Sequence, residues 1–159
     1  MIRSTTPIRP LAAAMLVAIA GCGRPSQQAA GSAPAPRAAG TLYQRLGSYD
    51  AIAAVVDDFL ARMLGDRQLA VFFENLNDAA KQRVRQMIVD QLCAASGGPC
   101  FYVGQDMRTA HQGMGITEDD WNRAVGHLVA TLDHFRVPQR ERQELLTAIS
   151  ALKADIVGQ

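Results

Sequence analysis

Residues 102–117 of this 159-residue chain read Tyr-Val-Gly-Gln-Asp-Met-Arg-Thr-Ala-His-Gln-Gly-Met-Gly-Ile-Thr. The stretch predicts a short helical segment around residues 106–112, which the glycines at 113 and 115 end. It contains one histidine, His111. A single histidine in a loosely helical segment is more often solvated or packed in a core than bound to a metal. The rest of the chain therefore decides what this residue does.

The chain before this stretch has the hydrophobic spacing of helices and no convincing alternation typical of a strand. A short helix over Leu42–Leu46 is expected to end at Gly47. Ser48 is expected to cap the next helix, which Gly65 ends. The second helix carries its apolar side chains along one stripe, which favours packing against other helices.

The second half of the chain continues this helical pattern. A third helix begins near Asn77 and ends at Gly97-Gly98-Pro99. Another begins after Thr117, which approximates a capping box with the acidic residue three positions later. The last helix begins at Pro138 and presents on one face Leu145, Ile149, Leu152 and Ile156. The sequence therefore predicts an all-α fold.

The first residues predict an export signal. Arg3 and Arg9 precede the apolar run Leu11–Ala20, and small residues lead to Cys22. This arrangement resembles a bacterial lipoprotein signal peptide over residues 1–21, in which Cys22 becomes the lipidated first residue of the mature chain. An ordinary signal peptide or an uncleaved anchor is the alternative interpretation, although the run is too short to span a bilayer of roughly 30 Å.

The remaining chain divides into two parts. Residues 22–40 are rich in proline, alanine and glycine and predict a flexible tether, whereas residues 41–159 are long enough for one compact domain, here predicted as the folded domain. Lipidation would hold the protein at a membrane facing the periplasm, and Gly23 favours the outer membrane. The formal net charge of +1, with arginines scattered among carboxylates, gives no indication of nucleic-acid binding.

Four motifs occur along the predicted domain in a fixed order. Leu42-Tyr43-Gln44-Arg45-Leu46-Gly47 opens it, Phe72-Phe73 forms an aromatic pair between helices, and Gly97-Gly98-Pro99 precedes the stretch over residues 102–117. Together these motifs resemble the group 1 truncated haemoglobins from Thr41 to about Val157, which is essentially the whole predicted domain.

The resemblance implies a truncated globin-like, two-over-two helical sandwich around a b-type haem, with His111 as the iron ligand. A neutral imidazole donates a lone pair to iron on one face of a haem and leaves the other face for a diatomic ligand. No Cys-x-x-Cys-His sequence occurs, so covalent c-type attachment is not indicated.

One further haem contact, that of Phe73, follows from the same resemblance, and the others are expected from the chemistry and positions of the residues themselves. Phe73 would stack on the porphyrin, whereas without the resemblance it would be interpreted as plain core packing. Met107 and Met114 would be flexible apolar filler, and Arg108 and Tyr102 would meet the haem propionates. The residues expected to pack behind the haem are Trp121 and Val125.

The distal side is where the sequence departs from the family. Many members have a tyrosine after the phenylalanine of the second helix, and its hydroxyl donates a hydrogen bond to bound O₂, but here Leu60 holds that position. Counting back from Gly97-Gly98 predicts a wholly apolar distal pocket formed by Leu60, Val84, Met87, Ile88 and Leu92. A shifted helix register would bring in a donor from Gln86 or Gln91 instead.

The cysteines and the remaining histidines allow simpler interpretations. Cys93 and Cys100 flank the glycine turn, and in an oxidising compartment they form either a disulfide or two buried thiols. His127 and His134 lie on one predicted helix without a cluster of further ligands, which favours solvated or core-packed histidines over a metal site.

Three functions are consistent with these features. The first is reversible binding of a diatomic gas ligand, O₂, NO or CO, at haem iron. The second is NO dioxygenation, which would need a partner reductase as electron donor, because the chain has no flavin or nicotinamide motif. The third is a haem-free helical interaction lipoprotein. The first is expected here, and whether the protein is also an enzyme stays open.

Overall fold

The computed structural model describes residues 40–159. The predicted signal peptide, Cys22 and all but the last residue of the predicted tether lie outside this range. Every regular element of the described part is a helix and none is a strand, as the sequence predicts. Its elements are α1 (Leu42–Arg45), α2 (Ser48–Gly65), α3 (Arg67–Ala70), the 3₁₀ turn η1 (Val71–Phe73), α4 (Asp78–Ala95), α5 (Met107–His111), α6 (Glu118–His134), α7 (Gln139–Ser150) and η2 (Lys153–Asp155). None of these helices is long and apolar enough to cross a membrane.

Side-chain caps start most of these helices. The Asn77 side chain accepts a hydrogen bond from the backbone of Ala80 at the start of α4, and Thr117 forms a capping box with Asp120 at the start of α6. Both starts were predicted. α3 was not predicted; it begins after Asp66, whose side chain accepts from the Gln68 amide.

Two predicted boundaries are wrong. Ser48 is not the cap of α2: Gly47 holds that position with a left-handed φ of 96°, and Ser48 is the first helical residue. The final helix does not continue to Ile156, because α7 ends at Ser150 and the chain turns through η2. Leu152 and Ile156 therefore lie beyond the helix that was expected to carry them.

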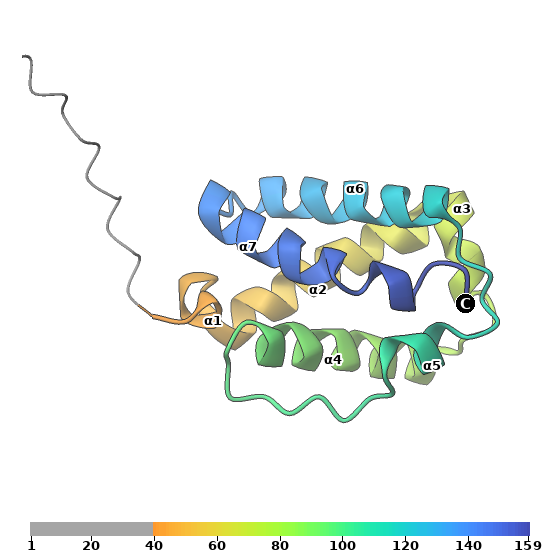
Figure 1. Ribbon diagram of the computed structural model, residues 1–159, viewed down its shortest axis with the longest axis horizontal. Coiled ribbons are helices and arrows are strands. Elements are labelled where there is room, and N and C mark those ends of the chain that lie inside the picture. The colour runs from red at the N-terminus through yellow and green to blue at the C-terminus, as the bar shows by residue number, and fades with distance from the viewer. Residues whose placement is uncertain (1–39) are drawn as a thin grey trace, which may run out of the picture. The chain divides into compact units, whose positions relative to one another are not determined.

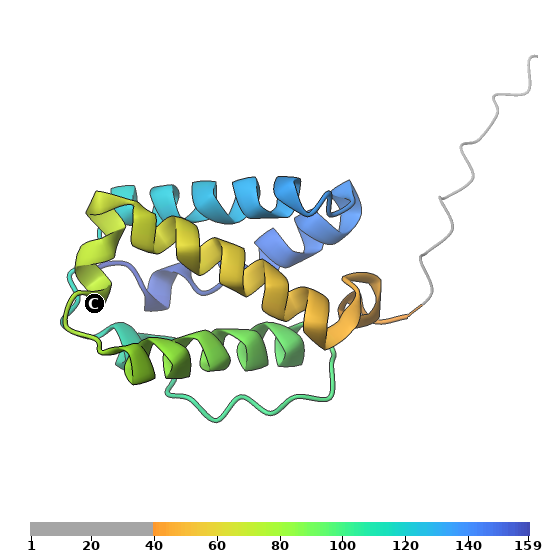
Figure 2. The same cartoon turned by 180° about the vertical axis from the view of Figure 1, so that it is seen from behind.

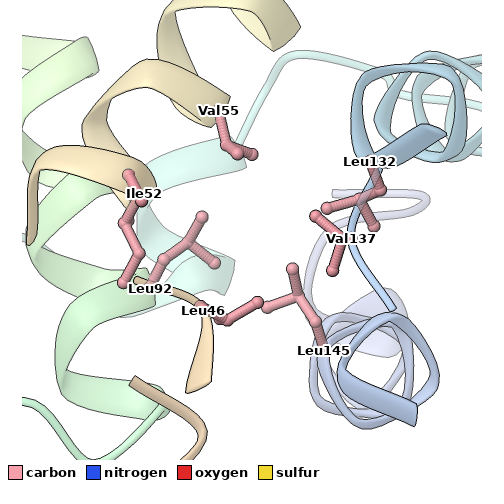
Figure 3. Close-up of a pocket in the computed structure, with 8 residues that line it drawn as sticks. Leu46, Ile52, Val55, Leu92, Leu132, Val137 and Leu145 are labelled. Carbon is pink, nitrogen blue, oxygen red and sulfur yellow. The ribbon is translucent and has the colours of Figure 1, made fainter. Parts of the chain in front are cut away.

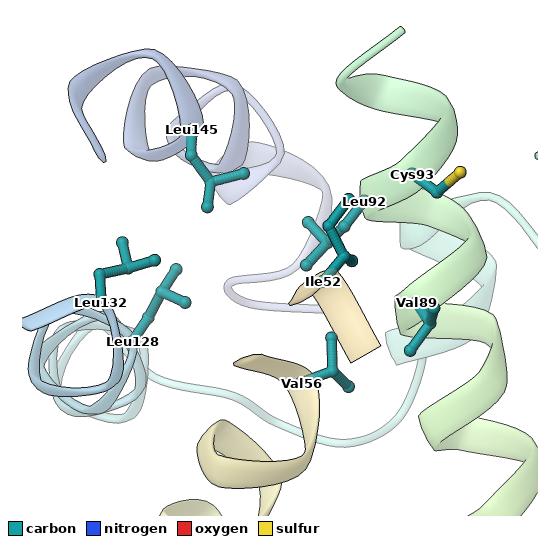
Figure 4. Close-up of a cluster of buried hydrophobic side chains, with 8 residues drawn as sticks. All are labelled: Ile52, Val56, Val89, Leu92, Cys93, Leu128, Leu132 and Leu145. Atoms are coloured by element: carbon teal, nitrogen blue, oxygen red, sulfur yellow. The ribbon is translucent and has the colours of Figure 1, made fainter. Parts of the chain in front are cut away.

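The long helices pack around a common apolar core. α2 contacts both α4 and α6, and Figures 1 and 2 show α4 along one side of α2 and α6 along the other, with α7 in front of α2 in Figure 1 and behind it in Figure 2. The core draws side chains from α2, α4, α6 and α7, and Figure 4 shows most of them pointing toward one another, with the Cys93 sulfur directed away from the rest. Its buried members are Ile52, Val56, Val89, Leu92, Cys93, Leu128, Leu132 and Leu145.

The start of the domain lies against the end of α4. The Tyr43 amide donates to the Ser96 carbonyl at 2.8 Å. Gly98 permits this approach, because a Cβ atom there would lie 2.5 Å from the Tyr43 ring and 2.7 Å from Cys93 Sγ. Arg45 then ties α1 to α7 through its Nε, which lies 2.9 Å from the Glu141 carboxylate.

Candidate functional site

His111 is the last residue of α5 and is half buried. Its Nδ1 lies 2.7 Å from the carbonyl oxygen of Met107, one helical turn earlier. A backbone carbonyl can only accept, so the hydrogen sits on Nδ1 and the lone pair sits on Nε2. This is the tautomer that a metal ligand needs, and the bond to Met107 also fixes the ring orientation.

α5 is held in place at both ends. The Asp106 side chain caps it by accepting from the Thr109 amide at 3.0 Å. Arg108 reaches the end of the chain, donating to Gln159 Oε1 at 2.7 Å and to Asp155 at 3.0 Å. After α5, the Gly115 amide donates to the Gln159 carbonyl. These contacts join the short helix to the C-terminal segment and so position His111.

The two residues expected at the haem propionates have protein partners in this structure. Arg108 is paired with Asp155, and Tyr102 donates from its hydroxyl to the Gln105 carbonyl at 2.6 Å. Burial, together with the nearby charge of Asp106, raises the pKa of Tyr102.

The apolar side chains assigned to the haem pocket are only partly covered by protein. Trp121 is buried, but the others on the proximal side are half buried. These are Phe73 in η1, Met107 and Met114 around His111, and Val125 in α6. Exposed apolar surface on several elements is what a large apolar group would cover on binding.

The residues assigned to the distal side lie on α2 and α4. Leu60 and Ile88 pack against the core cluster, and Leu92 belongs to it. Val84 and Met87 are half buried on α4. All five are aliphatic or thioether side chains, so none of them can donate a hydrogen bond.

The two glutamines considered as alternative donors have different positions. Gln86 is exposed and donates to Tyr49 Oη at 2.7 Å and to Asp90 at 2.9 Å. Gln91 is half buried, and its Nε2 lies 3.4 Å from Met107 Sδ. Gln91 therefore links α4 directly to the residue whose carbonyl orients His111. Sequence reasoning did not foresee this contact.

Two small cavities lie in the apolar interior. One, of about 20 Å³, lies between α2, α4, α6 and α7, and Figure 3 shows aliphatic side chains pointing into it. The other, of about 100 Å³, is lined by Gln91 and Ser96 and otherwise by apolar or alanine side chains. Leu92 and Leu145 line both. Both are far below the ~300–1,000 Å³ of cofactor pockets, so neither cavity by itself has the volume of a cofactor site.

The other two histidines pair with aspartates. His127 Nε2 lies 2.8 Å from Asp66, and this hydrogen bond is the main reason why the pKa of Asp66 is lowered. His134 Nδ1 lies 3.1 Å from Asp58. Within residues 40–159, no group of three or more histidine, cysteine or acidic side chains is gathered as a metal-ion site.

Cys93 and Cys100 form a disulfide, with their Cα atoms 5.7 Å apart. Cys93 is fully buried in the core on α4, and Cys100 packs against the same core. The bridge joins α4, which carries all the residues assigned to the distal side except Leu60, to the segment that leads into α5.

Comparisons with known proteins place these features in one family. The family model for bacterial-like globins matches residues 41–157. The chain is 37% identical over 116 residues to the group 1 truncated hemoglobin GlbN of Mycolicibacterium paratuberculosis, which covers 73% of this chain and 83% of the relative. It is 33% identical to the group 1 truncated hemoglobin GlbN of Synechocystis, covering 75% of this chain and 98% of that protein.

A solved structure agrees with these matches. The truncated hemoglobin from Tetrahymena pyriformis in its Fe(III) form matches with a TM-score of 0.70 at 28% identity, covering 76% of this chain and 100% of that structure. The similarity confirms the predicted two-over-two helical architecture.

Proposed function

The chain belongs to the bacterial-like globin family, as a group 1 truncated haemoglobin, and we propose that His111 binds its haem iron. The protein is a haem-binding globin that takes diatomic ligands such as O₂. When bound, the haem supplies an iron with a coordination position for such a ligand. The chain supplies the ligand on the opposite face and the walls of the pocket.

The hydrogen bond between His111 and Met107 is the observation that carries this assignment. His111 Nδ1 lies 2.7 Å from the Met107 carbonyl oxygen, so the proton stays on Nδ1. Nε2 keeps its lone pair free for iron. His127 and His134 are each engaged with an aspartate instead. Of the three histidines, His111 alone has methionines within four residues of it in the sequence, at positions 107 and 114, and both are half buried.

The half-buried apolar side chains support the fit of a haem. Phe73, Met107, Met114 and Val125 are all partly exposed. A porphyrin covering them would remove apolar surface from water, which contributes about 25 cal/mol per Å². Excluding water from this surface is the second task of the chain, after supplying the iron ligand.

The distal residues favour weak retention of polar ligands. Bound O₂ carries partial negative charge and is stabilised by a donor, whereas Leu60, Val84 and Ile88 offer none. We therefore infer fast O₂ release, with CO and NO binding relatively favoured. Gas binding is proposed ahead of NO dioxygenation for this reason. The dioxygenase would also require an electron-donating partner reductase.

The leader sequence supports a location outside the cytoplasm. We propose that Cys22 is lipidated and that the domain faces the periplasm on a membrane anchor, with the outer membrane favoured. Cys22→Ser should yield protein that is no longer lipidated, as intact-mass measurement of the purified chain will reveal. A lipid-sized mass increment that persists in the variant would contradict the assignment.

Absorption spectra test the haem assignment. The purified protein should give haem spectra in ferric, ferrous and CO-bound forms, and His111→Ala should lose haem or hold it loosely. His127→Ala and His134→Ala serve as matched controls and should keep the parent spectrum. If His127→Ala loses haem while His111→Ala keeps the parent spectrum, the proximal assignment is wrong. A wild-type protein without haem absorption would instead support the haem-free lipoprotein.

A further inference from the structure

Two apolar side chains stand out on the segment between α4 and α5. Phe101 is 85% exposed and Val103 is 86% exposed, whereas the other large exposed apolar residues, Leu64, Val71 and Phe135, are between 41% and 48% exposed. We name Phe101 and Val103 the apolar tip. Their side chains are almost completely in water, a costly arrangement that the packing of residues 40–159 does not require.

The structure of the segment holds the tip outward. Tyr102 and Gly104 are half buried, so exposed and covered side chains alternate along the segment. The Tyr102 ring packs down on Gly104, where a Cβ atom would lie 2.4 Å from the ring carbon Cζ. Its hydroxyl donates to the Gln105 carbonyl at 2.6 Å. The disulfide at Cys100 fixes the segment to the core immediately before Phe101.

The chemistry of the segment suits a lipid surface. Residues 97–105 read Gly-Gly-Pro-Cys-Phe-Tyr-Val-Gly-Gln and include no charged side chain. Insertion into the headgroup region would therefore not strip water from a charge. Phe101 and Val103 supply the exposed apolar area, and an aromatic ring such as that of Phe101 suits a membrane interface.

The apolar tip lies near Thr41, where the predicted tether joins the domain. Thr41 lies against Gly97, where a Cβ atom would be 3.3 Å from the Thr41 side chain. Gly98 lies against Tyr43 at the start of the domain. Phe101 follows Gly98 by three residues, so the Cα atoms of Phe101 and Gly98 are at most ~11 Å apart. Figure 1 shows this segment leaving α4 beside α1 and running along the side of α4 that faces away from α2. In the sequence, only residues 23–40 separate Cys22 from Thr41.

We propose that the apolar tip inserts into the lipid bilayer to which Cys22 is anchored. This inference rests on the proposed lipidation. The acyl chains hold the protein at the membrane, and the tip adds a second contact that orients the domain. Because α5 follows the tip directly, this contact sets which side of the globin faces the bilayer.

Photochemical cross-linking from the bilayer tests the proposal. The lipidated, haem-loaded chain is bound to vesicles of phosphatidylethanolamine and phosphatidylglycerol that contain a phospholipid with a diazirine in its acyl chain. After irradiation, peptide mass spectrometry should locate lipid adducts at residues 101–103. Phe101→Ser combined with Val103→Ser should reduce adducts in this segment at least tenfold while the haem spectrum stays unchanged. The matched control, Leu64→Ser with Val71→Ser, should keep them.

The outcomes distinguish insertion of the apolar tip from lipidation of Cys22. A lipid mass on Cys22 without adducts at residues 101–103 would support the anchor and overturn the tip. If Cys22 carries no lipid, the same full chain is added to the vesicles from solution. Lipid adducts at the apolar tip would then support insertion of the tip, and their absence would overturn it. Protection of the tip amides from hydrogen exchange in native membranes without lipid adducts would indicate a protein partner and overturn the lipid assignment.

Discussion

The Nδ1 atom of His111 lies 2.7 Å from the carbonyl oxygen of Met107 within the single helical turn of α5. Because isolated short helices are unstable, this bond depends on the contacts that hold α5 together. The Asp106 cap and the pairing of Arg108 with Asp155 supply them. The proposed proximal ligand is therefore positioned by the cap of its own helix and by the ion pair of that helix with the C-terminal segment.

Removing the cap of α5 should loosen the haem. Asp106→Ala deletes the acceptor for the Thr109 amide, a loss worth ~1 kcal/mol, which corresponds to about fivefold faster haem loss. Transfer of haem to excess apomyoglobin measures this rate. Asp106→Asn keeps an acceptor oxygen and should lose haem at nearly the parent rate. Equal rates for Asp106→Ala and the parent would show that the cap does not hold the ligand.

The disulfide should stabilise the folded domain. Cys93 and Cys100 are seven residues apart, and closing so short a loop contributes up to ~2–3 kcal/mol by restricting the unfolded chain. Urea unfolding with and without dithiothreitol should show this difference without any substitution. Non-reduced peptide mapping should recover the linked pair. Two thiols that alkylate in protein isolated from its own compartment would rule out the bridge.

Asp58 on α2, which accepts a hydrogen bond from Thr131 on α6, should make the stability of the domain depend on pH in the acid range. Hydrogen bonds from Arg62, Thr131 and His134 lower the pKa of Asp58 to about 2. A lowered folded-state pKa favours the ionised form, so its contribution is complete above the unfolded pKa of about 4 and is lost as the pH falls toward about 2.

Asp58→Asn should remove this contribution. Urea unfolding at pH 5, 4 and 3 should show a steep loss of stability for the parent and a shallower loss for the variant, which already starts lower at pH 5. A variant with the same pH slope as the parent would place the acid-sensitive group elsewhere.

The sequence predicts the fold where local chemistry determines it. Asn77 and Thr117 cap their helices with their own side chains, and both helix starts follow from the residues alone. Ser48 misleads because the left-handed backbone at Gly47 moves the cap one residue earlier. α7 ends at Ser150 and the chain then turns through η2, although the apolar spacing of the sequence continues to Ile156.

In the candidate site too, contacts within one helix follow from the sequence, whereas contacts between elements do not. In a helix, the spacing of four residues places His111 one turn after Met107, which brings the imidazole within reach of the Met107 carbonyl. The contacts of Gln91 with Met107 and of Arg108 with Asp155 join different elements, and only the packing of the helices brings them together. The exposure of Phe101 likewise depends on how Tyr102 packs, so no sequence pattern reveals it.

The last prediction concerns the residue at position 60. Leu60 is half buried, packs against the core and cannot donate to a ligand. Leu60→Tyr should supply a hydroxyl donor worth ~1–3 kcal/mol, which would slow O₂ dissociation by roughly ten- to a hundredfold. CO is less polar, so its dissociation should change little. Stopped-flow displacement of each gas measures both rates.

Two glutamine variants test whether another side chain donates to bound O₂ in the parent protein. Gln86 donates to Tyr49 and Asp90 on the exposed side of α4, so Gln86→Leu should leave O₂ dissociation unchanged. Gln91 contacts Met107, so Gln91→Leu should disturb the proximal side, seen as a shift in the iron–histidine stretching frequency, with less than a twofold change in O₂ dissociation. Slow O₂ release in the parent that becomes fast in Gln91→Leu would show that Gln91 turns toward the ligand and that the distal pocket is polar.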